Sequence, residues 1–128
     1  MGSNHILTPS TEDYLKAIYL LDKGDGVRSV DVAQHLKVAK PSVNHAVNTL
    51  VANGLATQIR YGQIYLTEYG IEQAKQIYYH HSTLKKFLMD VLDVEDETAE
   101  DEACSIEHLL STDTVDKIKE LTLKLQKD

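Results

Sequence analysis

Between residues 29 and 54 the sequence predicts a short helix, a tight connection and a longer helix, and this succession restricts the fold more than any other feature. Ser29 is the expected N-cap of the short helix. The longer helix begins near Lys40, has Pro41 at an early position that tolerates proline, and ends near Gly54. Apolar residues recur at helical spacing along it: Val43, Val47 and Leu50. We therefore expect the two helices to pack together as a helix-turn-helix.

The segments on either side complete a winged helix-turn-helix. A helix over residues 11–22 precedes the pair, and a short strand at residues 27–28 leads into it. Two β-like runs, residues 56–59 and 64–67, follow on either side of a turn that Gly62 supplies. This order of elements is typical of DNA-binding domains.

The C-terminal half is expected to be helical. A long helix with an expected break near His81 is followed by two further helices, which begin near Asp93 and after Ser111. The winged module does not need their apolar stripes, so they predict the interface of a homodimer. The fold class expected is mainly α, with a winged helix-turn-helix domain over residues 1–66 and an α-helical metal-binding and dimerisation domain over residues 67–128.

The polar face of the longer helix predicts contact with double-stranded DNA. Its side chains can donate and accept hydrogen bonds at base edges or phosphates in the major groove: Lys40, Ser42, Asn44, His45 and Asn48. The wing tip adds Arg60 and Tyr61, which suit backbone or minor-groove contacts. A dimer would read the two half-sites of a palindromic operator.

The distribution of charge separates two roles. The formal net charge is −7, which by itself argues against nucleic acid. Residues 1–64 hold six Lys and Arg against five Asp and Glu, a balance of +1, whereas residues 65–128 hold seven against fifteen, a balance of −8. The first half can therefore approach DNA, and the acidic second half suits a cation.

Cys104, Glu107 and His108 lie at positions i, i+3 and i+4 of one expected helix and therefore share a face. Thiolate, carboxylate and imidazole together suit a transition metal. His80 and His81 lie on the preceding helix, and Asp13 lies in the first turn of the N-terminal helix. Spacing alone also allows Cys104 to be a small core residue with Glu107 and His108 on the surface.

The single cysteine excludes a disulfide framework and any CxxC redox or zinc-finger pattern. The longest apolar runs are a few residues, and no basic segment followed by an apolar stretch opens the chain. We therefore expect a reduced, cytoplasmic protein with no membrane partner.

Three segments of the chain are distinctive: residues 10–15, the run Ala39-Lys40-Pro41-Ser42-Val43 that opens the longer helix of the pair, and residues 101–111. Together they resemble the diphtheria toxin repressor family of metal-dependent regulators, which includes the iron-dependent and manganese transport regulators. The resemblance extends from Thr8 to about Lys119. It implies a metal-dependent repressor, and it adds Ala39 and Pro41 to the expected DNA-binding residues.

The resemblance also implies the ligands of a primary metal site: Asp13, Cys104, Glu107 and His108. His81 falls on a ligand histidine in both branches of the family, and Glu100 falls where the iron branch places a histidine of an ancillary site. Lys16 and Lys85 stand where the family has carboxylate ligands of a second ion. The primary site is therefore better supported than a full second site.

The donor set predicts the metal. A thiolate from Cys104 suits Fe²⁺, Co²⁺, Ni²⁺ or Zn²⁺ better than Mn²⁺, whereas Asp13 is a hard ligand shared with the manganese branch. Fe²⁺ is the expected corepressor and Mn²⁺ the next candidate, with Zn²⁺, Co²⁺ or Ni²⁺ binding in vitro. The ion would join the N-terminal helix to the helix of Cys104, order the dimer for operator binding and repress metal-uptake genes.

Two other classes compete with this interpretation. A metal-independent winged-helix regulator could sense a small molecule or oxidation through Cys104, although a thiol among acids should have a raised pKa and react poorly. A metallohydrolase could use Glu107 as a base, but no feature supplies a substrate pocket or an oxyanion stabiliser. We therefore expect a protein that is not an enzyme.

Overall fold

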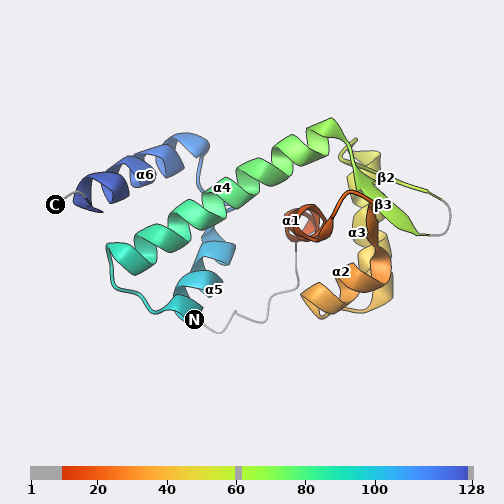
Figure 1. Cartoon of the computed structure of the whole chain (residues 1–128), viewed down its shortest axis with the longest axis horizontal. Helices are drawn as coiled ribbons and strands as arrows, with labels where there is room; N and C mark the ends of the chain where they lie inside the picture. The colour runs from red at the N-terminus through yellow and green to blue at the C-terminus, as the bar shows by residue number, and fades with distance from the viewer. Residues whose placement is uncertain (1–9, 60–61, 127–128) are drawn as a thin grey trace. The chain divides into compact units, whose positions relative to one another are not determined.

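A computed structural model describes residues 10–59 and 62–126. Within these ranges the chain forms, in order, α1 (Thr11–Leu21), β1 (Val27–Arg28), α2 (Ser29–Leu36), α3 (Lys40–Ala52), β2 (Ala56–Gln58), β3 (Gln63–Leu66), α4 (Glu68–Asp90), α5 (Asp96–Ile106) and α6 (Thr112–Gln126). The chain divides into two compact units, with the boundary between Lys75 and Gln76 (Figure 1). The expected fold class, a mainly helical chain with an N-terminal winged helix-turn-helix, is confirmed.

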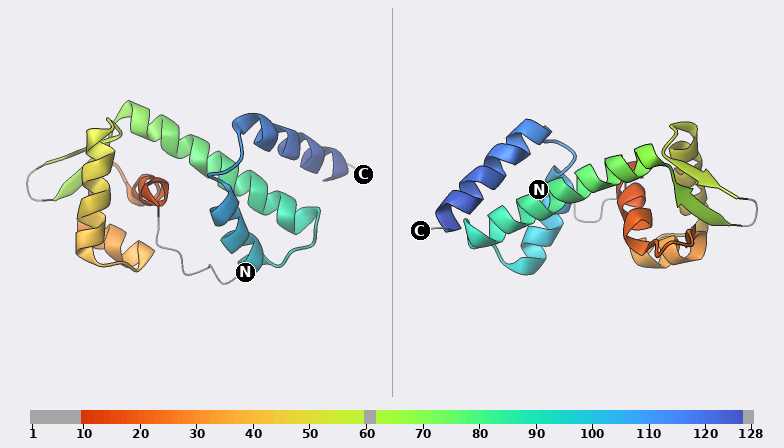
Figure 2. Two further views of the ribbon diagram at one scale, coloured as in Figure 1. Left: turned by 180° about the vertical axis from the view of Figure 1, so that it is seen from behind. Right: turned by 45° about the horizontal axis from the view of Figure 1, so that its top comes forward.

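The first unit is a winged helix-turn-helix. Helices α1, α2 and α3 contact one another pairwise, and the three strands form an antiparallel sheet in the order β1-β3-β2 (Figure 2). Val27 pairs with Ile64, and Gln58 pairs with Ile64 from the other side. The expected apolar face of α3 is confirmed. Fully buried side chains make the core of this unit: Leu15, Ile18, Val32, Val43, Val47, Leu50 and Ile64.

Two short-range features define the ends of elements in this unit. Ser10 caps α1 in a capping box, in which its hydroxyl accepts from the Asp13 N–H and its own N–H donates to the Asp13 carboxylate. Ser29 was expected to cap α2, but it lies inside the helix and Arg28 is the N-cap, without a side-chain bond to the helix. Ser29 is buried there, which agrees with a helical rather than a capping position.

The hairpin leads directly into α4, and Gly70 allows the close approach. A Cβ atom at Gly70 would collide with the backbone carbonyl of Leu55, so a larger residue would push α4 away from the end of α3. The Thr67 hydroxyl accepts from the Gly70 N–H and donates to the Gly54 carbonyl, which fixes the same junction. The helix that follows is continuous from Glu68 to Asp90, so the expected break near His81 is wrong.

The second unit consists of the rest of α4 with α5 and α6. Small residues let α5 pack closely, because Ala99 and Ala103 are fully buried one turn apart. Hydrogen bonds join α4 to α6, from Gln76 to Thr112 and from Tyr79 to Asp116. None of the helices in the described part of the chain has both the length and the apolar character that a bilayer span requires.

Candidate metal centre and nucleic-acid interface

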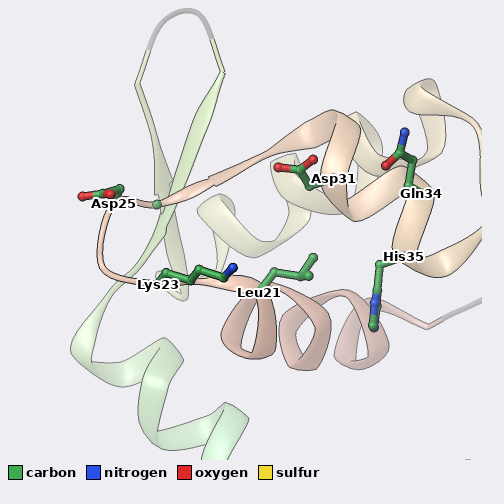
Figure 3. Close-up of a pocket in the computed structure, with 7 residues that line it drawn as sticks. Leu21, Lys23, Asp25, Asp31, Gln34 and His35 are labelled. Carbon is green, nitrogen blue, oxygen red and sulfur yellow. The ribbon is translucent and has the colours of Figure 1, made fainter.

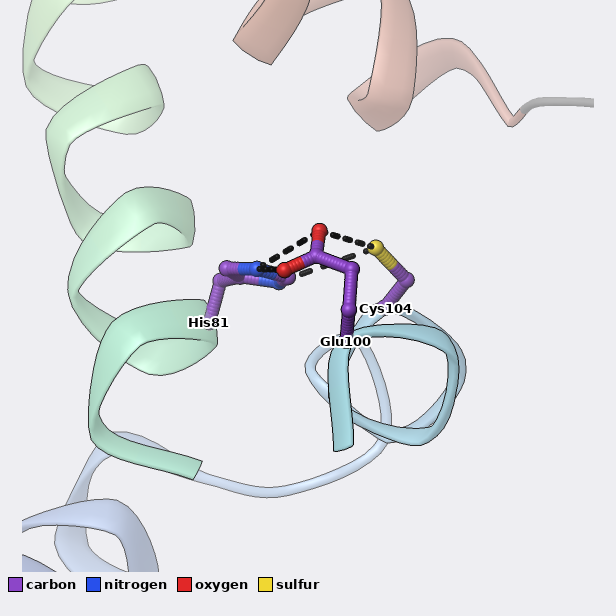
Figure 4. A group of neighbouring side chains, drawn as sticks. All are labelled: His81, Glu100 and Cys104. Carbon is purple, nitrogen blue, oxygen red and sulfur yellow. Dashed lines mark hydrogen bonds and ion pairs between the residues drawn. The ribbon is translucent and has the colours of Figure 1, made fainter. Parts of the chain in front are cut away.

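Three candidate ligands converge between α4 and α5. Glu100 and Cys104 are one turn apart on α5, so both side chains lie on the face toward α4, where His81 meets them (Figure 4). The Cys104 Sγ lies 3.7 Å from His81 Nδ1 and 3.7 Å from Glu100 Oε2, and His81 Nε2 lies 3.2 Å from Glu100 Oε1. One ligand atom from each of the three residues lies within 4.8 Å of the others, which is compatible with a shared ion.

Glu107 connects this group to His108. Its side chain is fully buried, its Oε1 lies 2.8 Å from His81 Nδ1, and its Oε2 lies 3.3 Å from His108 Nε2. A buried carboxylate is costly without partners, so the two imidazoles account for its position. The helix ends earlier than expected, since α5 stops at Ile106, Glu107 is its C-cap and His108 lies in the following turn.

His80, the neighbour of His81, holds the other side of this turn. It is buried, its Nδ1 lies 3.1 Å from the Glu107 carbonyl oxygen, and its Nε2 lies 3.0 Å from the Thr112 hydroxyl. The resemblance placed a ligand at His81 and assigned no role to His80. One contacts the side chain of Glu107 and the other contacts its backbone.

Lys85 adds a positive charge to the group. Its Nζ lies 3.1 Å from Glu100 Oε1 and 3.1 Å from Asp96 Oδ1. These bonds, to Asp96 first and then Glu100, raise the pKa of Lys85. Burial alone would raise the pKa of Glu100, but Lys85 and His81 outweigh it and lower that pKa below its ordinary value. Glu100 is therefore held as a carboxylate, the form that binds a cation.

Five of the six candidate metal residues thus lie together in the second unit: His81, Glu100, Cys104, Glu107 and His108. Two imidazoles, two carboxylates and a thiol form a donor set that fits a divalent transition metal. The sixth, Asp13, belongs to the first unit, where one carboxylate oxygen serves the cap of α1.

The candidate DNA-binding residues lie on the outer face of α3. All seven that the structure describes are exposed: Ala39, Lys40, Pro41, Ser42, Asn44, His45 and Asn48. Arg60 and Tyr61, expected at the wing tip, lie outside the described residues. An exposed polar face on the second helix of a helix-turn-helix matches the arrangement that reads the major groove.

A groove beside α3 joins two of these residues, Lys40 and Asn44, to others that the sequence did not indicate as DNA-binding. Its lining comes from β1, the start of α2, α3 and the two-stranded wing: Arg28, Ser29, Val30, Lys40, Asn44, Gln58 and Gly62. Arg28 reaches Asp31 with two contacts of 3.2 Å, and both side chains remain partly exposed. No local pattern marks Arg28 or Gln58, because the pairing of β1 with β3 brings them to α3.

A second hollow lies between the end of α1 and α2, lined by Leu21, Lys23, Asp25, Gly26, Asp31, Gln34 and His35. Figure 3 shows its labelled side chains spread along the rim rather than directed at one point. This surface therefore does not suggest a ligand.

Comparison with known proteins matches each half of the chain to a family model. A family model described as the iron dependent repressor N-terminal DNA binding domain matches residues 6–63. A second, described as the iron dependent repressor metal binding and dimerisation domain, matches residues 67–128. The chain belongs to the iron-dependent repressor family. This membership confirms the family expected from the three sequence segments, and members of this family are metal-dependent transcriptional regulators with DNA-binding and dimerisation domains.

Known relatives align with this chain over most of its length. An uncharacterized HTH-type transcriptional regulator of Methanocaldococcus jannaschii is 36% identical over 115 residues, which are 88% of this chain and 92% of the relative. The HTH-type transcriptional regulator MntR of Bacillus subtilis is 33% identical over 122 residues, 94% of this chain and 85% of the relative. Both are named as transcriptional regulators, in agreement with the expected class.

Solved structures share the fold. The manganese regulator SloR superposes with a TM-score of 0.81 at 28% identity over 90% of this chain, and IdeR of T. acidophilum with a TM-score of 0.75 at 29% identity over 89%. This iron-dependent repressor family member spans about half of each of those chains, since 54% of each is covered.

Proposed function

We propose that this protein is a transcriptional repressor that binds a palindromic operator as a homodimer when Fe²⁺ or Mn²⁺ is bound, and that it controls metal-uptake genes. The convergence of His81, Glu100, Cys104 and Glu107 in one unit carries the proposal, because these side chains supply metal-binding atoms within the domain that matches the metal-binding family model. The two matching family models both describe repressor domains, which supports a role other than catalysis.

We propose that the domains divide at residue 66, with DNA binding in residues 1–66 and metal binding and dimerisation in residues 67–128. The two family models, which end at residue 63 and begin at residue 67, support this division. Because such a regulator meets DNA inside the cell, the proposed location is the cytoplasm.

The ligands proposed for the metal are the six expected residues, with Asp13 from the first unit. Support for His81, Glu100, Cys104, Glu107 and His108 comes from their contacts, and support for Asp13 comes from the resemblance. A bound divalent ion supplies positive charge, which would offset the repulsion among two carboxylates and a thiolate. His81 now places both ring nitrogens against carboxylates, so it has to give up one of these contacts to present a nitrogen to an ion.

The thiol of Cys104 favours Fe²⁺ as the native ion, with Mn²⁺ as the next candidate. The names of relatives favour Mn²⁺ instead, because several are called MntR and one structural neighbour is described as a manganese regulator. In vitro, Zn²⁺, Co²⁺ and Ni²⁺ should bind the same donors.

An electrophoretic mobility shift assay tests the proposal. The protein and operator DNA are mixed in EDTA and then with Fe²⁺, Mn²⁺ or Zn²⁺ at constant ionic strength. We expect a shifted band only when metal is present. Equal DNA affinity with and without metal would instead support the metal-independent regulator that senses through Cys104.

A further inference from the structure

His80 is a buried histidine that the proposed metal site does not use. Its side chain lies beneath the short turn that joins α5 to α6, and this turn contains two of the proposed ligands, Glu107 and His108. A buried imidazole in contact with a ligand-bearing segment can influence the geometry of a metal centre without touching the ion.

The hydrogen bonds of His80 reach both ends of this turn. The Glu107 carbonyl can only accept, so His80 Nδ1 must donate to it, and Nε2 shares a hydrogen bond with the Thr112 hydroxyl. Thr112 in turn accepts from the Gln76 amide, 2.5 Å away. The result is a continuous chain of hydrogen bonds from Gln76 on α4 through Thr112 at the start of α6 and His80 to Glu107 at the end of α5.

His81 and His80 contact different parts of Glu107. His81 contacts the carboxylate of Glu107 at 2.8 Å, while His80 contacts its backbone carbonyl at 3.1 Å. The carbonyl contact limits the movement of the Glu107 main chain, and with it the direction of a side chain that has three rotatable bonds. Loss of the His80 bond would free the turn, and the entropy of ordering Glu107 and His108 would then oppose metal binding.

We propose that His80 is a positioning residue, which holds the turn of Glu107 and His108 in the conformation that binds metal. The inference rests on the proposed metal-binding function. His80 would act on the metal site indirectly. It contacts the Glu107 backbone carbonyl and the Thr112 hydroxyl rather than the ion.

Titration of the full-length protein with Co²⁺ tests this role, since absorption of thiolate-bound Co²⁺ reports on Cys104. His80→Phe keeps a ring but removes both hydrogen bonds. We expect it to bind Co²⁺ about 10- to 100-fold more weakly than the parent protein, the range seen when residues behind metal ligands are changed. His35→Phe is the matched control, because His35 is exposed on α2, and it should leave the affinity unchanged.

His80→Asn provides the decisive comparison. The asparagine amide can take the place of Nδ1–H and donate to the Glu107 carbonyl, so it should restore most of the affinity lost in His80→Phe. A merely space-filling role predicts the opposite order, since phenylalanine preserves the volume of the ring better than asparagine does. Parent-like affinity in the Phe variant, or equal weakness in the Asn and Phe variants, would overturn the proposal.

Two further measurements keep the result interpretable. Circular dichroism of the metal-free variants shows whether they are folded. If His80→Phe is not, Thr112→Val is read instead, because it removes the hydroxyl between Gln76 and His80 and should also weaken Co²⁺ binding. Failure of the parent protein to bind Co²⁺ contradicts the proposed function itself, whereas a parent that binds and a variant that binds equally well contradict only the role of His80.

Discussion

His81 Nδ1 lies 2.8 Å from Oε1 of Glu107, and the Glu107 side chain is fully buried. A buried carboxylate is stabilised by a hydrogen bond from a neighbouring imidazole ring. The same pair therefore contributes to the stability of the second unit and to its proposed metal chemistry, and experiments have to separate the two effects.

Glu107→Gln keeps the shape of the side chain and removes its charge, and measurements with and without metal separate its two effects. We expect this change to abolish metal-dependent operator binding and to lower the free energy of unfolding in EDTA by about 1–3 kcal/mol. Mobility shifts with Fe²⁺ or Mn²⁺ and chemical denaturation in EDTA measure the two effects. Glu102→Gln, the same change at an exposed position of α5, is the control and should alter neither.

Cys104→Glu should move the metal preference toward Mn²⁺. A carboxylate is a harder donor than a thiolate, so it favours Mn²⁺ relative to Fe²⁺ and Co²⁺. Anaerobic competition between Fe²⁺ and Mn²⁺, followed by elemental analysis of the bound ion, measures the preference. Cys104→Ser controls for loss of the thiol, and an unchanged ratio in the Glu variant would show that position 104 does not select the metal.

Asp13 contributes to the cap of α1 and is also a proposed ligand. Asp13→Ala removes both roles and should lower stability by about 1 kcal/mol from the lost cap. Asp13→Asn leaves an amide oxygen that can accept from the Ser10 N–H, so the cap should remain while the charge is lost. We expect the Asn variant to melt close to the parent temperature in EDTA and to need more metal for operator binding. Parent-like metal dependence would show that metal binding does not need the charge of Asp13.

Lys85 should limit the candidate ligands around Glu100 to one bound ion per chain, because its ammonium already neutralises the Glu100 carboxylate. Lys85→Glu replaces that charge with a carboxylate and should allow a second Mn²⁺ or Co²⁺ to bind. Equilibrium dialysis gives the number of ions. Lys86→Glu is a close control on the same helix, since Lys86 pairs with Asp90, and it should bind the same number as the parent. Equal stoichiometry in the two variants would contradict this effect.

Lys40→Ala tests the DNA surface. Removal of one phosphate contact from each half-site should weaken operator binding and reduce the slope of log affinity against log salt by about one per half-site. Mobility shifts at several salt concentrations with saturating metal measure the slope. Lys124→Ala, which removes the same charge from exposed α6, should leave the slope unchanged.

Local patterns predicted most of the fold. The spacing of Val43, Val47 and Leu50 identified the buried face of α3, and the glycine between two β-like runs identified the hairpin. Helix ends were harder to predict. Ser29 is a good capping residue, yet it lies within α2, because the strand pairing of Val27 and Arg28 sets where the helix begins.

The sequence predicted which residues belong to the candidate metal site but not the contacts between them. The spacing of Cys104, Glu107 and His108 and the resemblance identified the residues. Sequence could not show that Glu107 lies past the end of α5, that His80 holds its carbonyl, or that Lys85 pairs with Asp96 as well as Glu100. Such contacts join separate helices, so they depend on packing rather than on local spacing.

Arg28 forms an ion pair with Asp31, in a groove that also contains Lys40. The positive charge that the described residues of this groove offer a DNA backbone is therefore small, and contacts to phosphates account for nearly all of the affinity for DNA of arbitrary sequence. A regulator built in this way should leave non-cognate DNA quickly. Most copies would then be free to search for an operator, and occupancy would follow changes in the metal supply with little delay.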